Sequence, residues 1–279
     1  MKIAICGASG FVGSNLKRHL EKLDYHVETI ERRDLESKSL DFIIRYNDCI
    51  INLAGFPISN KWTEHNKKRI LSSRIDTTSK IVKAINLSKE PKTLINCSAI
   101  GIYSNDIICD ENHYTIGQGF LADVCRDWER AASACSSVHR LIITRLGLVL
   151  GKDNRTMKTL QAPLNMHIAP IIGRGRQSIS WIAIDDLVKI IEYLISNNKC
   201  RGSYNLTTPV YTSNKELMSL LAEKKKPTLK VYIPKLFIRL ILGEQATMYT
   251  EGQKIRPSRL SLEGYNFTYP NIKSYTDSL

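Results

Sequence analysis

The sequence has 279 residues, of which 43% are hydrophobic and 24% charged, and its formal net charge is +13. This length and composition predict a globular protein with a sizeable core, built as one large domain or two modest ones. Seven cysteines without a C-x-x-C pair and six histidines without ligand spacing argue against a disulfide framework and a zinc site, so we expect no metal.

The distribution of apolar and basic residues argues against two further classes of protein. No apolar run approaches the roughly 20 residues of a membrane helix, and the N-terminus lacks a separate signal-peptide core. We therefore expect a cytoplasmic protein with no membrane partner. The basic residues are spread along the chain without a recognition motif, which favours a solvated basic surface over nucleic-acid binding.

The first predicted element is a strand at residues 3–6, which leads through a glycine turn into a helix. Glycines at three-residue spacing between a strand and a helix are typical of a dinucleotide-binding turn. Gly7 permits the tight turn, Gly10 lets the backbone approach a pyrophosphate, and Gly13 lets the helix pack closely on the strand. The predicted cofactor-binding residues of this turn are Gly7, Ser9, Gly10, Phe11, Val12 and Gly13.

Strands and helices then alternate through the first half of the chain. Apolar runs predict strands at residues 27–30, 49–53, 93–97 and 141–150. One-faced apolar stripes predict a first helix from Val12 and two longer helices at residues 63–87 and 120–135. This alternation predicts an α/β fold with a Rossmann-type doubly wound parallel sheet, which we place at residues 1–151.

After residue 151 the pattern becomes mixed. Residues 152–177 hold prolines and glycines with weak periodicity and are predicted to be rich in loops. Three later helices are predicted: one from Asp185, one behind a capping box at residues 213–216, and one with Pro234 at its first position. Residues 152–279 should form a smaller mixed α/β lobe that binds substrate, with some segments returning to the Rossmann sheet.

The choice of cofactor depends on the end of the second strand. An acid there hydrogen-bonds the ribose 2′-hydroxyl of NAD, whereas an arginine accommodates the 2′-phosphate of NADP. Glu31 favours NAD, and Arg32 and Arg33 favour NADP, provided that Glu31 rotates away or pairs with an arginine. Two arginines against one acid favour NADP, with NAD as the alternative and three solvated surface charges as the third possibility.

Two more strand ends fit a nucleotide groove. Residues 52–55 (NLAG) end the third strand with small residues, so an adenosine can lie against the backbone of Leu53, Ala54 and Gly55. Residues 97–101 (CSAIG) end the fourth strand, where the nicotinamide side of the crevice should lie.

The chain resembles an atypical extended short-chain dehydrogenase/reductase of the NAD-dependent epimerase/dehydratase superfamily. It is most similar to the epimerase-like family that carries a C-terminal domain of unknown function. The matching segments run the whole length: residues 7–13, 51–55, 73–78 (SRIDTT), 125–129 (CRDWE), 145–151 (RLGLVLG), 173–177 (GRGRQ), 180–186 (SWIAIDD), 242–244 (LGE) and 252–253 (GQ).

The resemblance implies an NADP-binding fold and places several residues along the cofactor. It puts Glu31 and Arg32 at the adenine ribose, Arg74 near the phosphates and Val149 near the nicotinamide. For Arg74, the alternative is an ordinary arginine on the surface of a helix.

The usual Tyr-x-x-x-Lys pair of the superfamily is missing. When the chain is aligned on Glu129, the two positions fall on Leu121 and Cys125. Leu121 has no proton to exchange, and Cys125 cannot act as a lysine cation. The relatives that the chain resembles also lack the pair. Ala183 stands where many of them carry histidine.

Replacements for the pair are few, so the catalytic residues stay unknown. Ser98 at the end of the fourth strand and Tyr103 just beyond it are the candidates, against structural roles in local hydrogen bonding and packing. Ser98 is also a predicted cofactor contact. Asp123 and Arg126 lie at the crevice-facing end of the third helix. The second lobe adds three side chains suited to an anionic or sugar substrate, Arg174, Arg176 and Gln177, with solvated loop charges as the alternative for the two arginines.

The leading hypothesis is an NADP-binding oxidoreductase or sugar-nucleotide-epimerase-like enzyme. Its partner would be a small-molecule substrate, a sugar nucleotide or another carbonyl compound. A non-catalytic, NADP-sensing regulatory protein is the alternative that the missing pair supports, and a nucleic-acid-binding protein ranks last. The sequence leaves the oligomeric state open.

Overall fold

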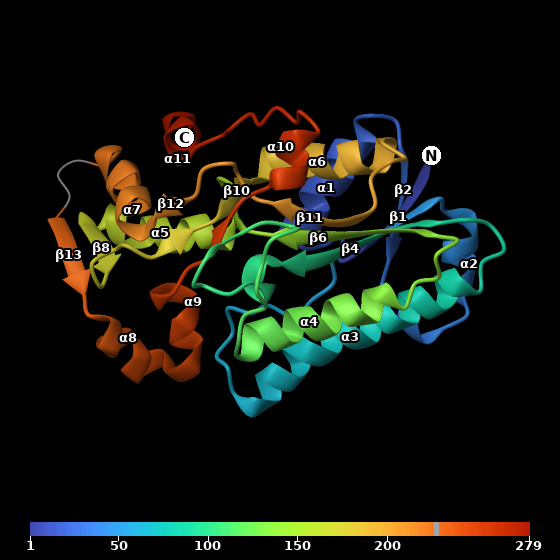
Figure 1. Ribbon diagram of the computed structural model, residues 1–279, viewed down its shortest axis with the longest axis horizontal. Coiled ribbons are helices and arrows are strands. Elements are labelled where there is room, and N and C mark those ends of the chain that lie inside the picture. The colour runs from blue at the N-terminus through green and yellow to red at the C-terminus, as the bar shows by residue number, and fades with distance from the viewer. Residues whose placement is uncertain (226–228) are drawn as a thin grey trace. The chain divides into compact units, whose positions relative to one another are not determined.

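A computed structural model describes residues 1–225 and 229–279 (Figure 1). The chain divides into two compact units, each assembled from separate segments. The first unit comprises residues 1–102, 118–145 and 187–204, and the second comprises residues 103–117, 146–186 and 205–279. The domain boundary expected at residue 151 separates two parts of the chain that would fold independently. Compactness alone does not show independent folding, so this boundary stays a prediction.

A six-stranded sheet carries the dinucleotide-binding fold. Its strand order is β11-β6-β4-β3-β1-β2, and β1 pairs in parallel with both β2 and β3. The strand order reverses between β1 and β3, as in a doubly wound sheet, so the predicted fold class is confirmed. The strands are β1 Lys2–Cys6, β2 His26–Ile30, β3 Cys49–Asn52, β4 Thr93–Ala99, β6 Arg140–Leu146 and β11 Gly202–Leu206.

Helices cover both faces of this sheet. Figure 1 shows α1 and α6 on one face and α3 and α4 on the other. The bounds are α1 Phe11–Glu21, α2 Ser39–Tyr46, α3 Glu64–Asn86, α4 Phe120–Ser133 and α6 Ile184–Ser196, with short 3-10 turns at Asp34–Glu36 and Ile100–Ile102. Alternate β1 residues such as Ala4 and Cys6 join the apolar side chains of α2 and α3 in one core, because successive strand residues point to opposite faces.

The strand predicted at residues 141–150 is in fact two strands, β6 and β7 (Leu148–Leu150), which separate at Gly147. The Gly147 amide donates to the Leu206 carbonyl, and a Cβ at Gly147 would lie 2.7 Å from the Ser180 carbonyl oxygen. The close backbone approach turns the chain out of the sheet, and β7 pairs with β10 (Trp181–Ala183) instead.

The loop predicted at residues 152–177 was also wrong, because this segment contains α5 (Arg155–Asn165) and β8 (Ile168–Ile172). The Asn154 side chain caps α5 by accepting from the Met157 amide at 2.6 Å. Met157 is fully buried in the second unit's core with Leu164 and Trp181. Burial of these side chains outweighs the proline within α5 and the weak local periodicity.

The rest of the second unit is mixed α/β, as expected. Ser213 and Glu216 form the predicted capping box at the start of α7. Pro234, predicted at the first helical position, is the N-cap of α8, so the helix begins one residue later, at Lys235. Its remaining elements are β5 Ile108–Cys109, β9 Ser178–Ile179, β12 Thr212–Ser213, α7 Asn214–Glu223, β13 Leu229–Ile233, α8 Lys235–Leu242, a 3-10 turn at Gly243–Ala246, α9 Thr247–Thr250, β14 Lys254–Ile255, α10 Ser258–Leu262 and α11 Ile272–Asp277.

Among the described residues, no helix has both the length and the apolar character needed to cross a membrane.

Candidate functional site

The glycine turn joins β1 to α1 in the first unit, and its geometry explains each glycine. Gly7 has φ +86°, and a Cβ there would lie 2.8 Å from the Leu53 carbonyl carbon. A Cβ at Gly13 would lie 2.2 Å from the Gly7 carbonyl oxygen, so only glycine lets α1 approach the strand this closely. Gly10 is exposed, and its backbone is therefore open to a ligand.

The N-terminus of α1 is open to an anion. Gly10 is its N-cap and supplies no side-chain hydrogen bond, and the first turn carries no acidic residue. The first amides and the positive end of the helix dipole therefore face outward from the turn. Ser9 is exposed, and Phe11 and Val12 are half-buried beside it. These residues form a cradle suited to a pyrophosphate.

The charged residues after β2 comprise an ion pair and a neighbouring exposed arginine. The Arg33 Nε lies 3.0 Å from the Glu31 carboxylate, so these two exposed charges pair with each other. The Asp34 carboxylate accepts from the Glu31 amide at 2.7 Å, and this hydrogen bond lowers the Asp34 pKa. Arg32 forms no ion pair or hydrogen bond with another described residue, and its guanidinium is exposed.

A buried polar network fixes the ends of β3 and β4. The Asn52 side-chain Nδ2 donates to the Thr78 hydroxyl at 2.9 Å and to Asn96 Oδ1 at 2.8 Å. The Trp128 indole also donates to the Thr78 hydroxyl. Asn52 Oδ1 in turn accepts from the Ala54 amide at 3.2 Å and so sets the path of the predicted cofactor contacts Leu53 and Ala54.

The sequence reading missed this network. Asparagines inside the apolar strand runs at residues 49–53 and 93–97 were the available signal, because a buried amide needs partners. Neither the partner helix nor the Trp128 contact could be read from the local pattern.

Arg74 on α3 reaches the loop after β3. Its Nη1 donates to the Phe56 and Ile70 carbonyls, both at 3.0 Å, and its guanidinium lies over the Trp128 ring at 5.1 Å. A Cβ at Gly55 would lie 2.9 Å from Arg74 Cζ, so the guanidinium packs directly on the Gly55 backbone. Burial lowers the Arg74 pKa.

Ser98 is buried and belongs to a charged cluster at the end of β4. Its hydroxyl donates to Glu129 Oε1 at 2.6 Å. Arg145 holds the same carboxylate with two bonds, Nε to Oε1 at 2.9 Å and Nη2 to Oε2 at 2.8 Å. Ser98 therefore bonds a side chain, not the local backbone, and its roles toward cofactor and substrate remain predictions.

Leu121 and Cys125, at the positions of the missing pair, face the turn after β4. A Cβ at Gly101 would lie 3.5 Å from Leu121 Cβ and 3.6 Å from Cys125 Sγ. Burial raises the pKa of Cys125, and of nearby Cys97, to about 12. A thiol cannot carry positive charge in either protonation state, so neither cysteine replaces a lysine.

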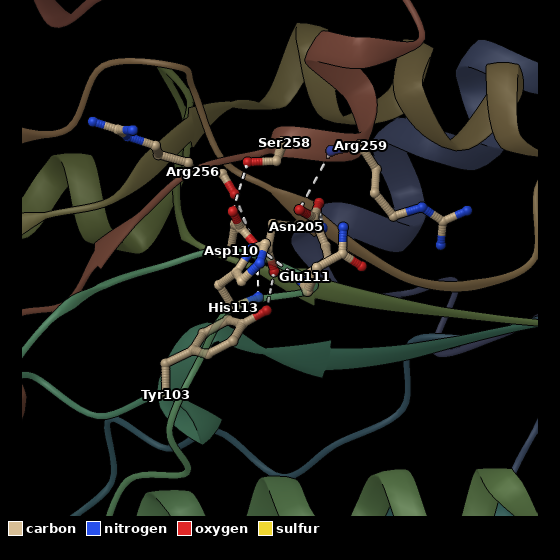
Figure 2. Close-up of polar contacts among 9 residues, drawn as sticks. Tyr103, Asp110, Glu111, His113, Asn205, Arg256, Ser258 and Arg259 are labelled. Carbon is tan, nitrogen blue, oxygen red and sulfur yellow. Dashed lines mark hydrogen bonds and ion pairs between the residues drawn. The ribbon is translucent and has the colours of Figure 1, made fainter.

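Tyr103 lies in the second unit and is fully buried. Its hydroxyl donates to Asn205 Oδ1 at 2.6 Å, and Figure 2 shows the ring pointing at that side chain. The Asn205 backbone N–H donates to Glu111 Oε1 at 2.9 Å, and its side-chain Nδ2 donates to the Arg256 carbonyl at 2.9 Å. The catalytic assignment of Tyr103 remains a prediction.

Tyr103, Asn205 and Glu111 form a hydrogen-bonded cluster. The carboxylates of Glu111 and Asp110 connect this cluster to the start of α10. Glu111 Oε2 accepts from the Arg259 amide, and Asp110 accepts from the Ser258 hydroxyl (Figure 2). Burial raises the Glu111 pKa, while the backbone amides that it accepts from oppose the rise. The cluster thus fixes the segment around Tyr103.

A cavity of about 340 Å³ in the second unit gathers the predicted substrate-binding side chains. It is lined by Gly173, Arg174, Arg176, Gln177 and Lys235. Gln177 Nε2 donates to the Ile172 and Tyr249 carbonyls, and its buried Oε1 accepts no hydrogen bond from a described residue. Cations and an amide around one hollow suit an anionic ligand.

The other predicted residues make local contacts, and their roles toward cofactor and substrate stay predictions. Val149 is half-buried on β7 of the second unit, and its carbonyl accepts from the Asn154 side chain at 2.6 Å. Asp123 and Arg126 pair with each other at 2.8 Å on α4. Within the part of the chain that the structure describes, no group of three or more His, Cys, Asp or Glu side chains is placed to hold a metal ion.

Comparison with known proteins agrees with this fold. Residues 3–207 match the NAD dependent epimerase/dehydratase family, and residues 233–278 match a domain of unknown function, DUF1731. An epimerase family protein of Staphylococcus aureus strain MRSA252 is 32% identical, over 99% of this chain and 97% of that protein.

Solved structures extend the comparison. The human epimerase family protein SDR39U1, solved with NADPH, has a TM-score of 0.90 and 26% identity over 100% of this chain and 98% of its own. A nucleoside-diphosphate sugar epimerase from Corynebacterium glutamicum has a TM-score of 0.78 and 26% identity, covering all of this chain and 57% of its own. The chain belongs to the NAD dependent epimerase/dehydratase family and carries the DUF1731 domain at its C-terminal end.

Proposed function

We propose that this protein is a cytoplasmic NADP(H)-dependent oxidoreductase of the short-chain dehydrogenase/reductase type, acting on a small anionic carbonyl compound or sugar nucleotide. The observation that carries the proposal is the N-terminus of α1, which has no side-chain cap. The close approach of Gly13 to Gly7 holds this end of the helix against the strand. A ligand with a pyrophosphate satisfies the outward amides of such a helix.

The preference for NADP rests on the charges after β2. Because Arg33 pairs with Glu31, the carboxylate is partly neutralised and Arg32 is left for a 2′-phosphate. Arginine binds phosphate through two parallel hydrogen bonds, which a hydroxyl cannot match. The NADPH found in the human relative of similar fold agrees with this choice.

The proposed substrate site is the cavity around Arg174, Arg176 and Gln177. The two exposed guanidinium groups of Arg174 and Arg176 would hold an anionic group of the substrate. The bound cofactor supplies hydride chemistry, and the protein has to orient a carbonyl against it. Ser98 and Tyr103 are the candidates for proton exchange, each needing release from its present partner.

Turnover tests this proposal. The purified chain is incubated with NADPH and carbonyl compounds offered in pairs that differ only by a phosphate or carboxylate. We expect NADPH oxidation with the anionic member of a pair, and a rate at least about tenfold lower for the Arg176→Gln variant, since one charge-assisted hydrogen bond is lost. Equal rates for both members of every pair would contradict the substrate assignment.

One observation favours a second function, a non-catalytic NADP-sensing protein. Leu121 and the neutral thiol of Cys125 occupy the positions of the proton-transferring pair. NADPH binding without turnover across the panel would support the sensing function over the enzyme.

A further inference from the structure

Helix α8 of the second unit presents a large apolar face to solvent. All of its residues are described, and none of them is buried. Four large apolar side chains, each between 55% and 77% exposed, form what we call the α8 face: Leu236, Phe237, Leu240 and Ile241. An exposed apolar patch of this kind marks a surface that another body covers.

The spacing of these four residues makes the α8 face continuous. Positions i, i+1, i+4 and i+5 fall within about 140° around a helix of 3.6 residues per turn. Ile238 and Leu242 lie on the opposite side and are the half-buried residues of α8. The helix therefore rests on that narrow side and holds the α8 face away from the rest of its unit, and Figure 1 shows it at the outer edge of the unit.

Basic side chains lie around the α8 face. Lys235 and Arg239, one turn apart, flank it on the helix itself, and Lys230 is exposed on β13 just before the helix. Glu251 lies 3.8 Å from Arg239 and offsets part of this charge. The segment at residues 229–250 nevertheless holds three basic residues and one acidic residue.

The positive surface continues beyond the helix. Lys235 also lines the cavity that contains Arg174 and Arg176. Exposed tyrosines stand close by: Tyr232 lies on β13, and Tyr249 lies on α9, which contacts α8. Tyrosine suits a boundary at which an apolar layer meets water, because its ring is apolar and its hydroxyl is polar.

Charge decides which body fits this face. In a two-fold dimer the same patch of both copies would meet, so Lys235 and Arg239 would approach their own counterparts on a molecule of net charge +13. An anionic lipid surface has the opposite charge, and its acyl layer accepts apolar side chains that project from a helix. The lipid surface therefore complements both the apolar face and its basic surroundings.

We propose that α8 anchors this protein peripherally to an anionic membrane surface, with the α8 face in the lipid layer and the surrounding basic side chains at the headgroups. The sequence predicted no membrane partner because it lacks a run long enough to span a bilayer, but a helix that lies in the interface needs no such run. The proposal goes beyond the proposed function and does not depend on NADP binding.

Vesicle co-sedimentation of the full chain tests the anchor. The probes are vesicles of phosphatidylcholine alone and vesicles of phosphatidylcholine mixed in equal parts with phosphatidylglycerol. We expect the anionic vesicles to bind at least about tenfold more tightly, because several basic side chains meet the lipid charge. This advantage should shrink as salt is added, because salt screens the attraction.

Two double variants separate the α8 face from apolar exposure in general. Leu236→Gln with Leu240→Gln should weaken binding to the anionic vesicles about 100-fold, because two apolar side chains no longer enter the lipid. The matched control, Val210→Gln with Leu262→Gln, changes two comparably exposed side chains of the same unit and should bind as wild type does. Leu262 belongs to α10, which Figure 1 shows on the opposite side of the unit from α8.

Both double variants should melt as wild type does, because exposed substitutions change stability little. The anchor is overturned if wild type does not bind the anionic vesicles, binds both vesicle types equally, or binds as well with the α8 double variant. A wild-type dimer in sedimentation velocity that this variant converts to monomer, without vesicle binding, would also overturn it and assign the α8 face to a second copy of the chain.

Discussion

Replacing Arg145 with methionine lowers the free energy of unfolding by about 3–5 kcal/mol, because the buried Glu129 carboxylate loses both of its bonds to the guanidinium. The two side chains are only 4% and 11% exposed, so water cannot replace the lost partner. Urea unfolding monitored by circular dichroism measures the effect.

Arg126→Met is the matched control for Arg145→Met. Arg126 pairs with Asp123 at the same 2.8 Å, but the two side chains are 41% and 50% exposed. Exposed pairs contribute about 0–1 kcal/mol, so this variant should unfold almost as wild type does. Equal losses in the free energy of unfolding for the two variants would show that Arg145 does not stabilise the buried Glu129 carboxylate.

Gly13→Ala is the second change with a large expected effect. The new Cβ would lie 2.2 Å from the Gly7 carbonyl oxygen, so α1 must move away from β1. Overpacking of this kind destabilises by about 1–3 kcal/mol, and the displaced amides no longer converge on a phosphate. We expect a lower melting temperature and a loss of NADPH affinity of about 100-fold or more.

Gly101→Ala controls for the addition of a methyl group beside α4. Its Cβ would meet Leu121 and Cys125 at 3.5 and 3.6 Å, which are ordinary contacts. This variant should melt close to wild type. Wild-type NADPH binding by Gly13→Ala would refute the role of the glycine turn.

Local patterns were enough to predict the parts of the molecule that form locally. The β1 strand, the glycine turn and α1 follow from an apolar run, glycine spacing and a one-faced stripe, and the structure has them within a residue or two. The Ser213 capping box was likewise readable, because its two hydrogen bonds join residues three apart.

Other features depended on contacts between distant residues. The break between β6 and β7 arises because Gly147 meets Ser180, more than thirty residues away. Helix α5 is held by burial of Met157 and Leu164 in a core that the local proline and glycine pattern does not reveal. Glu129 and Arg145 lie in separate segments of the sequence, and no local pattern predicts that they form an ion pair.

The candidate site divides in the same way. Residue type and position predicted the glycines and Arg32, whose surroundings on the sheet now support the NADP proposal. No carboxylate of the described residues pairs with Arg74, and this follows from the folded chain, since it depends on which side chains surround α3.

The central claim, that this chain binds NADP(H) through the glycine turn and Arg32, is tested most directly by titrating the purified protein with NADPH and NADH in a calorimeter. The account predicts NADPH binding at least about tenfold tighter, and loss of that preference in Arg32→Ala with NADH affinity unchanged, because only the 2′-phosphate contacts this arginine. No heat of binding with either nucleotide, or tighter binding of NADH, would contradict it.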